Sequence, residues 1–490
     1  MNRYYELFPK VSPLNRKHTF CLEPQPAADV FKGVRRFGIS IISAATLDHH
    51  VEKKVEADST GKVFFEFSAP VAGEYCIALY RAENETDKEP VFLTGFFSLP
   101  DNLLKLIPFK GDWHIHTNYS DGTESPVCMA AKARMAGLDY AAITDHNCFK
   151  ASIEAFEEAQ KYNIDLLLFT GEEVTYKNGY GHVISINAKK GICEDILPRE
   201  IWSDIPDAAL DEIVDDFCSG FLPQVEKLKK VPGLDMKKYA YLHGIIKKIH
   251  ELGGLAVLAH PFWKQSGVLN LTRPCYEQML YNGAVDAIEL FGDVNIEENI
   301  CSFARLQTAL TTLYAGPNFS PSKGATRYAG PSFSPSKGAT RYAGPSFSPS
   351  KGATESGYPV VGNSDAHRGD NHTLGRTWTV AFAEKLDRAA IIDAVLNQRT
   401  AACTTAASGE VIIAGPFHFV EYAYFLQREF FPFHDEICKA LGKHYLNVLR
   451  GGLESGDKKN ALLRSLRDYY KKCFLTNYSD FSLQNISKEF

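Results

Sequence analysis

The sequence predicts an α/β fold built around a parallel barrel of seven strand–helix units, with a β-sandwich before the barrel and helices after it. Three observations predict this order. Residues 1–108 contain short β-prone runs separated by turn residues. From Gly111 onward, strand-like and helix-like segments alternate. Beyond residue 411 the hydrophobic residues recur at helical spacing.

The N-terminal part, residues 1–108, is predicted to form the sandwich. Its candidate strands are rich in β-branched and aromatic residues, and turn residues at 59–61 and 72–73 separate them. This part has no cluster of possible ligands, so packing or substrate positioning is its expected role. The candidate strands are Phe37–Ile42, Val63–Phe67, Tyr75–Tyr80 and Val91–Phe97.

The first barrel strand is predicted around residues 113–116. Trp113 and Ile115 alternate there with His114 and His116. Because side chains alternate across a strand, both histidines are expected on one face.

The other elements of the barrel, which is assigned to residues 109–410, follow from the same kind of pattern. Ser125-Pro126 predicts a helix start, because proline is favoured at the first helical position, and Gly137 predicts its end. The acidic segment 191–237 is expected to be an irregular insertion or lid. Further strands are expected at 140–144, 165–169, 182–186, 255–258, 285–290 and 359–361, and helices at 151–162 and 241–252.

Two further segments complete the organisation. Residues 411–490 are predicted to be a helical cap on the barrel, with helices at 417–428, 434–449 and 459–474. Residues 314–354 hold three tandem copies of a 14-residue unit, YAGPSFSPSKGATR, with Asn318 in place of a serine in the first copy and the last residue missing from the third. Its Gly, Pro and Ser content predicts a flexible surface loop. The alternative is that its basic and aromatic residues gate a site or hold an anionic substrate.

Composition narrows the possible partners and the compartment. The formal charge is 53 minus 59, or −6, which provides no overall attraction for nucleic acid or an anionic membrane. The 11 cysteines include no CxxC pair, which favours a reducing compartment. The sequence has no signal-like start and no apolar run long enough to span a bilayer, so a cytoplasmic protein is expected.

The most informative feature is a set of histidines and carboxylates that sit at or just past predicted strand ends. Only His182 lies at a strand start. In barrels of this kind the chemistry collects at the carboxyl ends of the strands, and crowded polar groups are costly to leave unpaired. Imidazole and carboxylate groups are also the ligands of hydrolytic metals, so one metal cluster is predicted. Its candidate ligands are His114, His116, Asp121, His146, Glu173, His182, His260, Asp365 and His367.

These motifs resemble those of the PHP (polymerase and histidinol phosphatase) metallohydrolase superfamily. The resemblance covers about residues 109–410 and rests on His-x-His with Ser-Asp-Gly, Thr-Asp-His, Gly-x-Glu, His-Pro and Ser-Asp-Ala-His, in that order. It implies a distorted seven-stranded β/α barrel with two or three divalent metal ions, Zn, Mn or Fe. The Ser-Asp-Gly form and the N-terminal β-domain resemble one branch of the superfamily.

The resemblance also implies a division of the ligands among the metals. The first metal would be held by His114, His116, Glu173 and Asp365. Glu173 would bridge to a second metal held by His182 and His260. Asp121, His146 and His367 would complete a third site. Some relatives have histidine where this chain has Asp121, which leaves the number of metals open.

Two further carboxylates lie near these motifs. Glu172 is an alternative to Glu173, but the Gly-x-Glu spacing favours Glu173. Glu289 ends a predicted strand and is expected to support a ligand or the fold.

The expected activity is hydrolysis by water that a metal activates. Asp365 is expected to orient the nucleophile and His260 to protonate the leaving group, while Lys264 and Arg368 are candidates to bind a phosphate. The predicted substrate is a small phosphorylated metabolite or nucleotide. A carboxylic or carbamate ester hydrolase and a non-catalytic metal-binding module are the alternatives. A nucleic-acid substrate is less expected from the charge, and the oligomeric state stays open.

Overall fold

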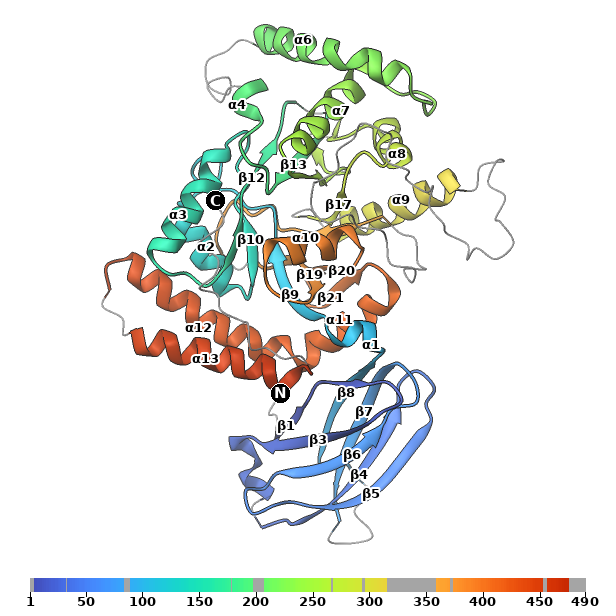
Figure 1. The fold of residues 1–490 in the computed structure, drawn as a ribbon, viewed down its shortest axis with the longest axis vertical. Helices are drawn as coiled ribbons and strands as arrows, with labels where there is room; N and C mark the ends of the chain where they lie inside the picture. Colours follow the sequence, from blue (N-terminus) through green and yellow to red (C-terminus); the bar gives the residue numbers. More distant parts are fainter. Residues whose placement is uncertain are drawn as a thin grey trace.

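The chain folds into a β-rich N-terminal part, a central α/β part and C-terminal helices that lie between the two (Figure 1). The computed structural model describes residues 4–31, 33–82, 89–177, 179–196, 207–265, 268–292, 296–314, 358–370, 373–452 and 456–475. The predicted repeat loop, apart from Tyr314, lies outside the described residues.

The N-terminal part consists of two sheets that enclose one core. Phe20, Phe65, Tyr75 and Phe96 meet in this core, and the Tyr75 and Phe96 rings stack with centroids 5.0 Å apart. One sheet has the order β1 (Tyr5–Phe8), β3 (Lys17–Pro24), β6 (Val63–Ser68); the other has the order β2 (Val11–Pro13), β8 (Phe92–Leu99), β7 (Gly73–Arg81), β4 (Arg36–Ser43), β5 (His49–Glu56).

Four of these strands, β4, β6, β7 and β8, lie where the sequence predicted them. The sequence did not reveal β1, β2, β3 and β5. Strands β3 and β5 carry several charged residues and lack a continuous β-branched run, and their pairing with neighbouring strands is what makes them strands.

Two sheets build the central part. The first has the order β11 (Leu167–Phe169), β10 (Tyr140–Ala142), β9 (Ile107–Asp112), β19 (Thr377–Ala383), β20 (Thr400–Thr405), β21 (Val411–Ala414). The second has the order β12 (Gly171–Val174), β13 (His182–Ile186), β14 (Leu255–Ala259), β17 (Ala287–Phe291), β18 (Val360–Gly362). Isolated β-bridges between Ile115 and Ala366 and between His146 and Glu173 also join segments of the central part.

The expectation of a purely parallel barrel is wrong at β13. This strand is antiparallel to both of its neighbours, β12 and β14. Only a short connection links β12 to β13, and a parallel partner would need a crossover of a dozen or more residues. The reversal places His182, at the start of β13, opposite Ala259, at the end of β14. His182 therefore lies at the same end of the sheet as the ligands that follow strand ends.

Helices surround these sheets and follow the predicted signals in part. α2 begins at Pro126, and Gly137 follows its end with a φ of +90°. The central helices are α2 (Pro126–Met135), α3 (Phe149–Lys161), α4 (Cys193–Ile196), α6 (Asp207–Glu226), α7 (Met236–Glu251), α8 (Arg273–Asn282), α9 (Ile296–Tyr314) and α10 (Arg388–Leu396).

The segment 191–237 is not irregular, because it contains the 20-residue helix α6. α6 packs against α7 at the outer end of the molecule (Figure 1). The Asp235 side chain caps α7 by accepting hydrogen bonds from the backbone N–H groups of Lys237 and Lys238. The acidic residues that made this segment look irregular lie largely on the exposed side of α6.

The C-terminal helices are α11 (Phe417–Glu429), α12 (Phe431–Leu449) and α13 (Gly456–Cys473), close to their predicted positions. They share one hydrophobic core with the first central sheet. The predicted boundary at residue 411 needs correction, since β21 (Val411–Ala414) pairs with β20. The C-terminal helices and the central part therefore share one core and are not separate domains.

A buried polar network crosses the contact between α12 and the central part. Arg134, 2% exposed, reaches Asp139 and Asp165 at 2.9 and 3.0 Å. His434 Nε2 lies 3.0 Å from Asp139 Oδ1, and Tyr445 donates a 2.5 Å hydrogen bond to Asp165. Charges buried this deeply are stabilising only when all partners stay in place.

The N-terminal part docks on the same helices. The ring of Phe97 lies 4.9 Å from that of Tyr422 and 5.7 Å from that of Phe425. Lys10 is fully buried at this contact, with its Nζ 3.7 Å from Glu429 and its backbone N–H bonded to the carbonyl of Cys473. The N-terminal part is thus anchored to the central part through α11 and α13.

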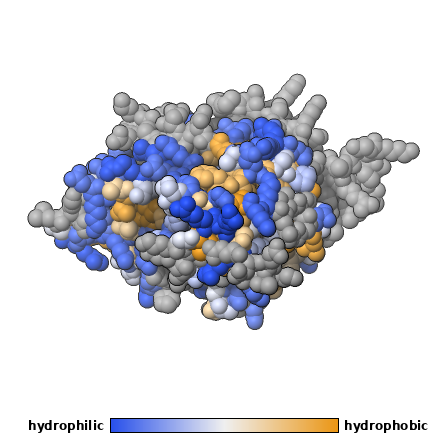
Figure 2. Space-filling model, turned by 90° about the horizontal axis from the view of Figure 1, so that it is seen from below, coloured by the Kyte–Doolittle hydropathy of each residue, from blue (hydrophilic) through white to orange (hydrophobic). Residues whose placement is uncertain are grey.

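Seen from below, hydrophobic residues reach the surface in separate areas among hydrophilic ones (Figure 2). Exposed large hydrophobic side chains of the N-terminal part include Leu47, Phe64, Val71 and Leu93. Scattered exposure of this kind is normal for folded domains. None of the described helices combines the length and the apolar composition needed to cross a lipid bilayer.

Candidate metal centre

The structure brings all nine predicted ligands together, although they span residues 114–367. They form overlapping groups whose donor atoms lie within 4.8 Å of one another. Glu173, fully buried on β12, is at the centre. Its two oxygens face five histidines: His114, His116, His146, His182 and His260.

The first group surrounds Glu173 Oε2 and Asp365 Oδ1. His114 Nε2 lies 3.3 Å from the first oxygen and 3.2 Å from the second. His116 Nε2 lies 3.5 and 2.9 Å from the same two oxygens. The rings of His114 and His116 are 5.0 Å apart, as expected for one face, but they follow the end of β9 at Asp112 and do not lie in a strand at 113–116 as predicted.

The second group surrounds the other oxygen of the same carboxylate. His182 Nδ1 lies 2.8 Å and His260 Nε2 3.2 Å from Glu173 Oε1. His260 Nε2 is also 3.6 Å from Asp365 Oδ2. Glu173 therefore has one oxygen in each group, the arrangement of a bridging carboxylate.

The third group lies around Asp121. His367 Nε2 is 3.2 Å and His146 Nε2 3.6 Å from Asp121 Oδ2. His116 Nδ1 is 3.8 Å from Asp121 Oδ1, so the ring of His116 faces two groups. His146 also faces two, because its Nδ1 is 2.8 Å from Glu173.

Exposure increases from the first two groups to the third. The side chains of His114, His116 and Glu173 are fully buried, and His182 and His260 are 11% and 5% exposed. Asp121 is 55% exposed and His367 36%. The Asp121 group is thus the one in contact with solvent.

The donors fit a metal ion better than they fit one another. His114 Nε2, His116 Nε2, Glu173 Oε2 and Asp365 Oδ1 are buried and form no hydrogen bond with the described residues. Buried polar atoms without partners are costly. A divalent cation held by these imidazole and carboxylate groups would remove that cost.

Electrostatics lead to the same conclusion. Burial opposes charge on Glu173, but His114, His146 and His182 hold its pKa well below the usual range. Burial also lowers the pKa of His116 and His182, which favours the neutral imidazole that binds metals. Around His146, burial is outweighed by Glu173 and Asp121, which raise its pKa to about 10. The cluster therefore contains carboxylate charge that attracts cations.

Glu289 supports two of these histidines. It is fully buried at the end of β17 and accepts from His114 Nδ1 at 2.9 Å and from the backbone N–H of His260 at 3.1 Å. Asn363 donates to the same carboxylate at 3.0 Å. This is the expected supporting role, and it fixes the ring of His114 so that Nε2 faces the cluster.

We expect Glu289→Ala to weaken metal binding about 10- to 100-fold, because His114 loses the group that orients its ring. Equilibrium dialysis against Zn²⁺ would measure the change. Glu277→Ala, which removes a partly exposed carboxylate of α8 that pairs with Arg273, is the control. Unchanged affinity in the Glu289 variant would contradict this role.

The carboxylate of Asp145 anchors the loop that carries Asp121. It accepts hydrogen bonds from the Thr117 backbone at 2.8 Å and from the Ser120 hydroxyl at 2.7 Å. Gly122 is required beside it, since a Cβ atom there would lie 2.7 Å from backbone atoms of His116 and Thr117. The Ser-Asp-Gly and Thr-Asp-His motifs thus form one loop and its anchor.

The two carboxylates Glu172 and Glu173 face opposite sides of β12. Glu172 Oε1 accepts a 3.4 Å hydrogen bond from the backbone N–H of Cys193 and a second from Ile192. Glu172 therefore anchors the segment after β13 rather than joining the cluster.

The predicted substrate-binding residues lie beside the ligands in the chain. Lys264 and Arg368 are both exposed. Lys264 follows Trp263, whose ring lies 5.4 Å from that of His260, and Arg368 follows His367. Their phosphate-binding role stays a prediction.

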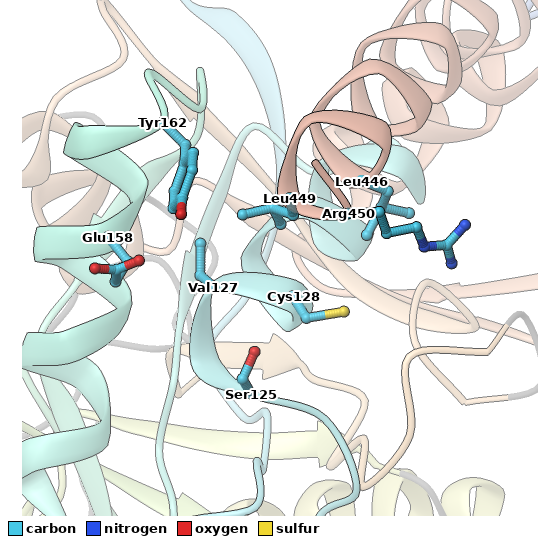
Figure 3. Close-up of a pocket in the computed structure, with 8 residues that line it drawn as sticks. All are labelled: Ser125, Val127, Cys128, Glu158, Tyr162, Leu446, Leu449 and Arg450. Carbon is cyan, nitrogen blue, oxygen red and sulfur yellow. The ribbon is translucent and has the colours of Figure 1, made fainter. Parts of the chain in front are cut away.

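A separate cavity of about 300 Å³ lies between α2, α3 and the end of α12 (Figure 3). It contains none of the nine candidate ligands. Cys128 lies in the wall of this cavity. The lining residues are Ser125, Val127, Cys128, Glu158, Tyr162, Leu446, Leu449 and Arg450.

A family model described as the PHP domain matches residues 112–280. Residues 112–280 form a PHP domain. The match confirms the resemblance drawn from the motifs and supports the predicted class, a metal-dependent hydrolase. The matched segment contains seven of the nine candidate ligands, and the structure adds Asp365 and His367 from beyond its end.

Several known proteins match parts of the chain. A 5'-3' exoribonuclease of Haemophilus influenzae is 27% identical over 191 residues, 31% of this chain and 69% of that protein. An uncharacterized protein of Methanocaldococcus jannaschii is 26% identical over 102 residues, 19% of this chain and 57% of that protein. A solved two-domain protein of Bacteroides vulgatus, with a predicted PHP-like metal-dependent phosphoesterase, is 18% identical at a TM-score of 0.37, covering 61% of this chain and 66% of that one.

Proposed function

We propose that this protein is a metal-dependent phosphoesterase that acts on a small phosphorylated metabolite or nucleotide. The observation that carries the proposal is the convergence of nine donor groups, among them Glu173 with one oxygen in each of two groups. Within the PHP class this set fits two or three divalent ions, Zn, Mn or Fe, in a distorted seven-stranded barrel.

When bound, such ions lower the pKa of water and neutralise charge that develops on phosphate oxygens. Residues of the chain would orient the water, transfer the proton and bind the phosphate. Asp365, with a side chain 21% exposed, has one oxygen toward His116 and the other toward His260, and it would orient the attacking water. A site histidine would donate a proton to the leaving group; His260, the expected donor, does not serve in this way when its Nε2 faces a metal ion. Lys264 and Arg368 would hold the phosphate.

The backbone of Asp365 supports this role. Its φ is +51°, a left-handed conformation that is uncommon for residues other than glycine. Aspartate tolerates it better than most residues. The unusual backbone turns the carboxylate toward His114 and His116, and such local strain is frequent at functional sites.

A phosphodiesterase acting on RNA is the second candidate, because the Haemophilus relative is a 5'-3' exoribonuclease. The net charge of −6 argued against nucleic acid, but it describes the whole chain and not the surroundings of Asp121. Carboxylic or carbamate esters, and metal binding without catalysis, are the remaining alternatives.

One experiment separates these functions. Metal content of the purified protein would be measured first, followed by hydrolysis of phosphate monoesters, a short 5'-phosphorylated RNA, and carboxylic and carbamate esters. We expect two or three metal ions per chain and fastest turnover of a small phosphate ester. Fastest turnover of RNA or of a carboxylic ester would replace the proposal, and bound metal without any turnover would favour the binding module.

A further inference from the structure

Asn270 occupies a position that no sequence motif revealed. It follows the short strands β15 (Lys264–Gln265) and β16 (Val268–Leu269) and is 1% exposed. Its side-chain Nδ2 lies 3.2 Å from Nδ1 of His260. The opposite ring atom, Nε2, faces Glu173 and Asp365. Asn270 therefore stands behind a candidate ligand, on the side away from the cluster.

The backbone of Asn270 joins three segments of the centre. Its N–H donates to the carbonyl of Trp263 at 2.8 Å, which closes the turn after His260. Its carbonyl accepts from Gly179 at 3.1 Å and from Gly181 at 2.8 Å. Gly181 directly precedes His182. One residue thus positions the chain around both histidines of the second group.

The amide of Asn270 has one end unused. Its Oδ1 is buried without a hydrogen-bond partner among the described residues. A half-turn of the amide exchanges Oδ1 and Nδ2 in nearly the same space. In that orientation Oδ1 would accept a hydrogen bond from a proton on His260 Nδ1, and the Nε2 lone pair would be directed toward Glu173 and Asp365.

We infer that Asn270 is a positioning residue for the metal centre. Its side-chain oxygen holds the proton of His260 on Nδ1 and thereby presents Nε2 to a divalent cation. Metal-binding histidines nearly always donate the other ring N–H to an acceptor, which sets the tautomer and the ring orientation. Glu289 does this for His114. Asn270 would do it for His260, so the inference rests on the proposed metal centre.

The test compares two substitutions that leave the backbone contacts intact. Asn270→Leu keeps the approximate volume and removes the acceptor, whereas Asn270→Asp provides a carboxylate acceptor. We expect Asn270→Leu to bind Zn²⁺ about 10- to 100-fold more weakly, measured by competition with a chelator. Asn270→Asp should bind within a few-fold of the wild type or more tightly. The thermal stability of each metal-free variant is measured alongside.

The outcomes that overturn the inference are distinct. Wild-type affinity in Asn270→Leu would overturn it, and so would an Asn270→Asp variant as weak as Asn270→Leu, since a packing role predicts equal losses. A double-mutant cycle with His260→Ala provides a second test. The Asn270→Leu effect should vanish in that background, and an undiminished effect would show that it does not act through His260.

Failure of the proposed function gives a different result. A wild-type protein that binds Zn²⁺ but hydrolyses no phosphate ester refutes the phosphoesterase proposal and leaves the Asn270 comparison valid. A wild-type protein that binds no Zn²⁺ refutes both, because the ring of His260 would then have no cation to face.

Discussion

Replacing Glu173 with glutamine is expected to abolish metal binding and hydrolysis. The amide keeps the shape of the side chain but removes the charge that faces five histidines, the nearest at 2.8 Å. Metal ions supply several kcal/mol of transition-state stabilisation, and a loss of ~4 kcal/mol corresponds to about 10³-fold in kcat/KM. Metal content by mass spectrometry and kcat/KM for the best phosphate ester would measure both losses.

Glu172 provides the matched control one residue away. It is also fully buried on β12, but its carboxylate faces the backbone N–H groups of Ile192 and Cys193. Glu172→Gln should keep its metal and most of its activity while lowering stability. A Glu173→Gln variant with wild-type metal content and turnover would show that the nine donors are not the metal centre.

Removing Asp139 is expected to have the largest effect on folding. Its carboxylate is 3% exposed and bonds to Arg134 at 2.9 Å and to His434 at 3.0 Å. Asp139→Ala leaves both cations buried without this partner, and breaking a buried pair in this way costs about 3–5 kcal/mol. Urea denaturation at pH 7 would measure it. Asp468→Ala, on the exposed side of α13, should change stability by less than about 0.5 kcal/mol.

The same carboxylate predicts a pH dependence. Burial opposes its charge, but His434 and Arg134 outweigh burial and hold the pKa of Asp139 at about 2. Because this is below the value of about 3.9 in an unfolded chain, its contribution is fully present above pH ~4 and is lost as pH falls toward 2. Stability of the wild type should therefore fall over that range more steeply than that of Asp139→Ala. Parallel curves would contradict this account.

Some of the fold could be predicted because its signals are local. Ser125-Pro126 marks the start of α2, and the alternation around His114 and His116 puts both rings on one face. Strands β1, β3 and β5 lacked a local signal, since pairing across a sheet makes them strands. A 20-residue helix was missed in 191–237 because its acidic residues obscured its apolar side.

The candidate site was also predicted only in part from the sequence. The sequence alone determined which residue types the centre contains, because each ligand stands in a short motif next to a strand. Only the tertiary structure decided how they group. The reversal of β13 brings His182 beside His260, and Asp365 lies beside His114 although the two are far apart in the sequence. Glu289 and Asn270 act on histidines through contacts between strands and loops. Such contacts depend on strand order and direction, which a local pattern of residues does not encode.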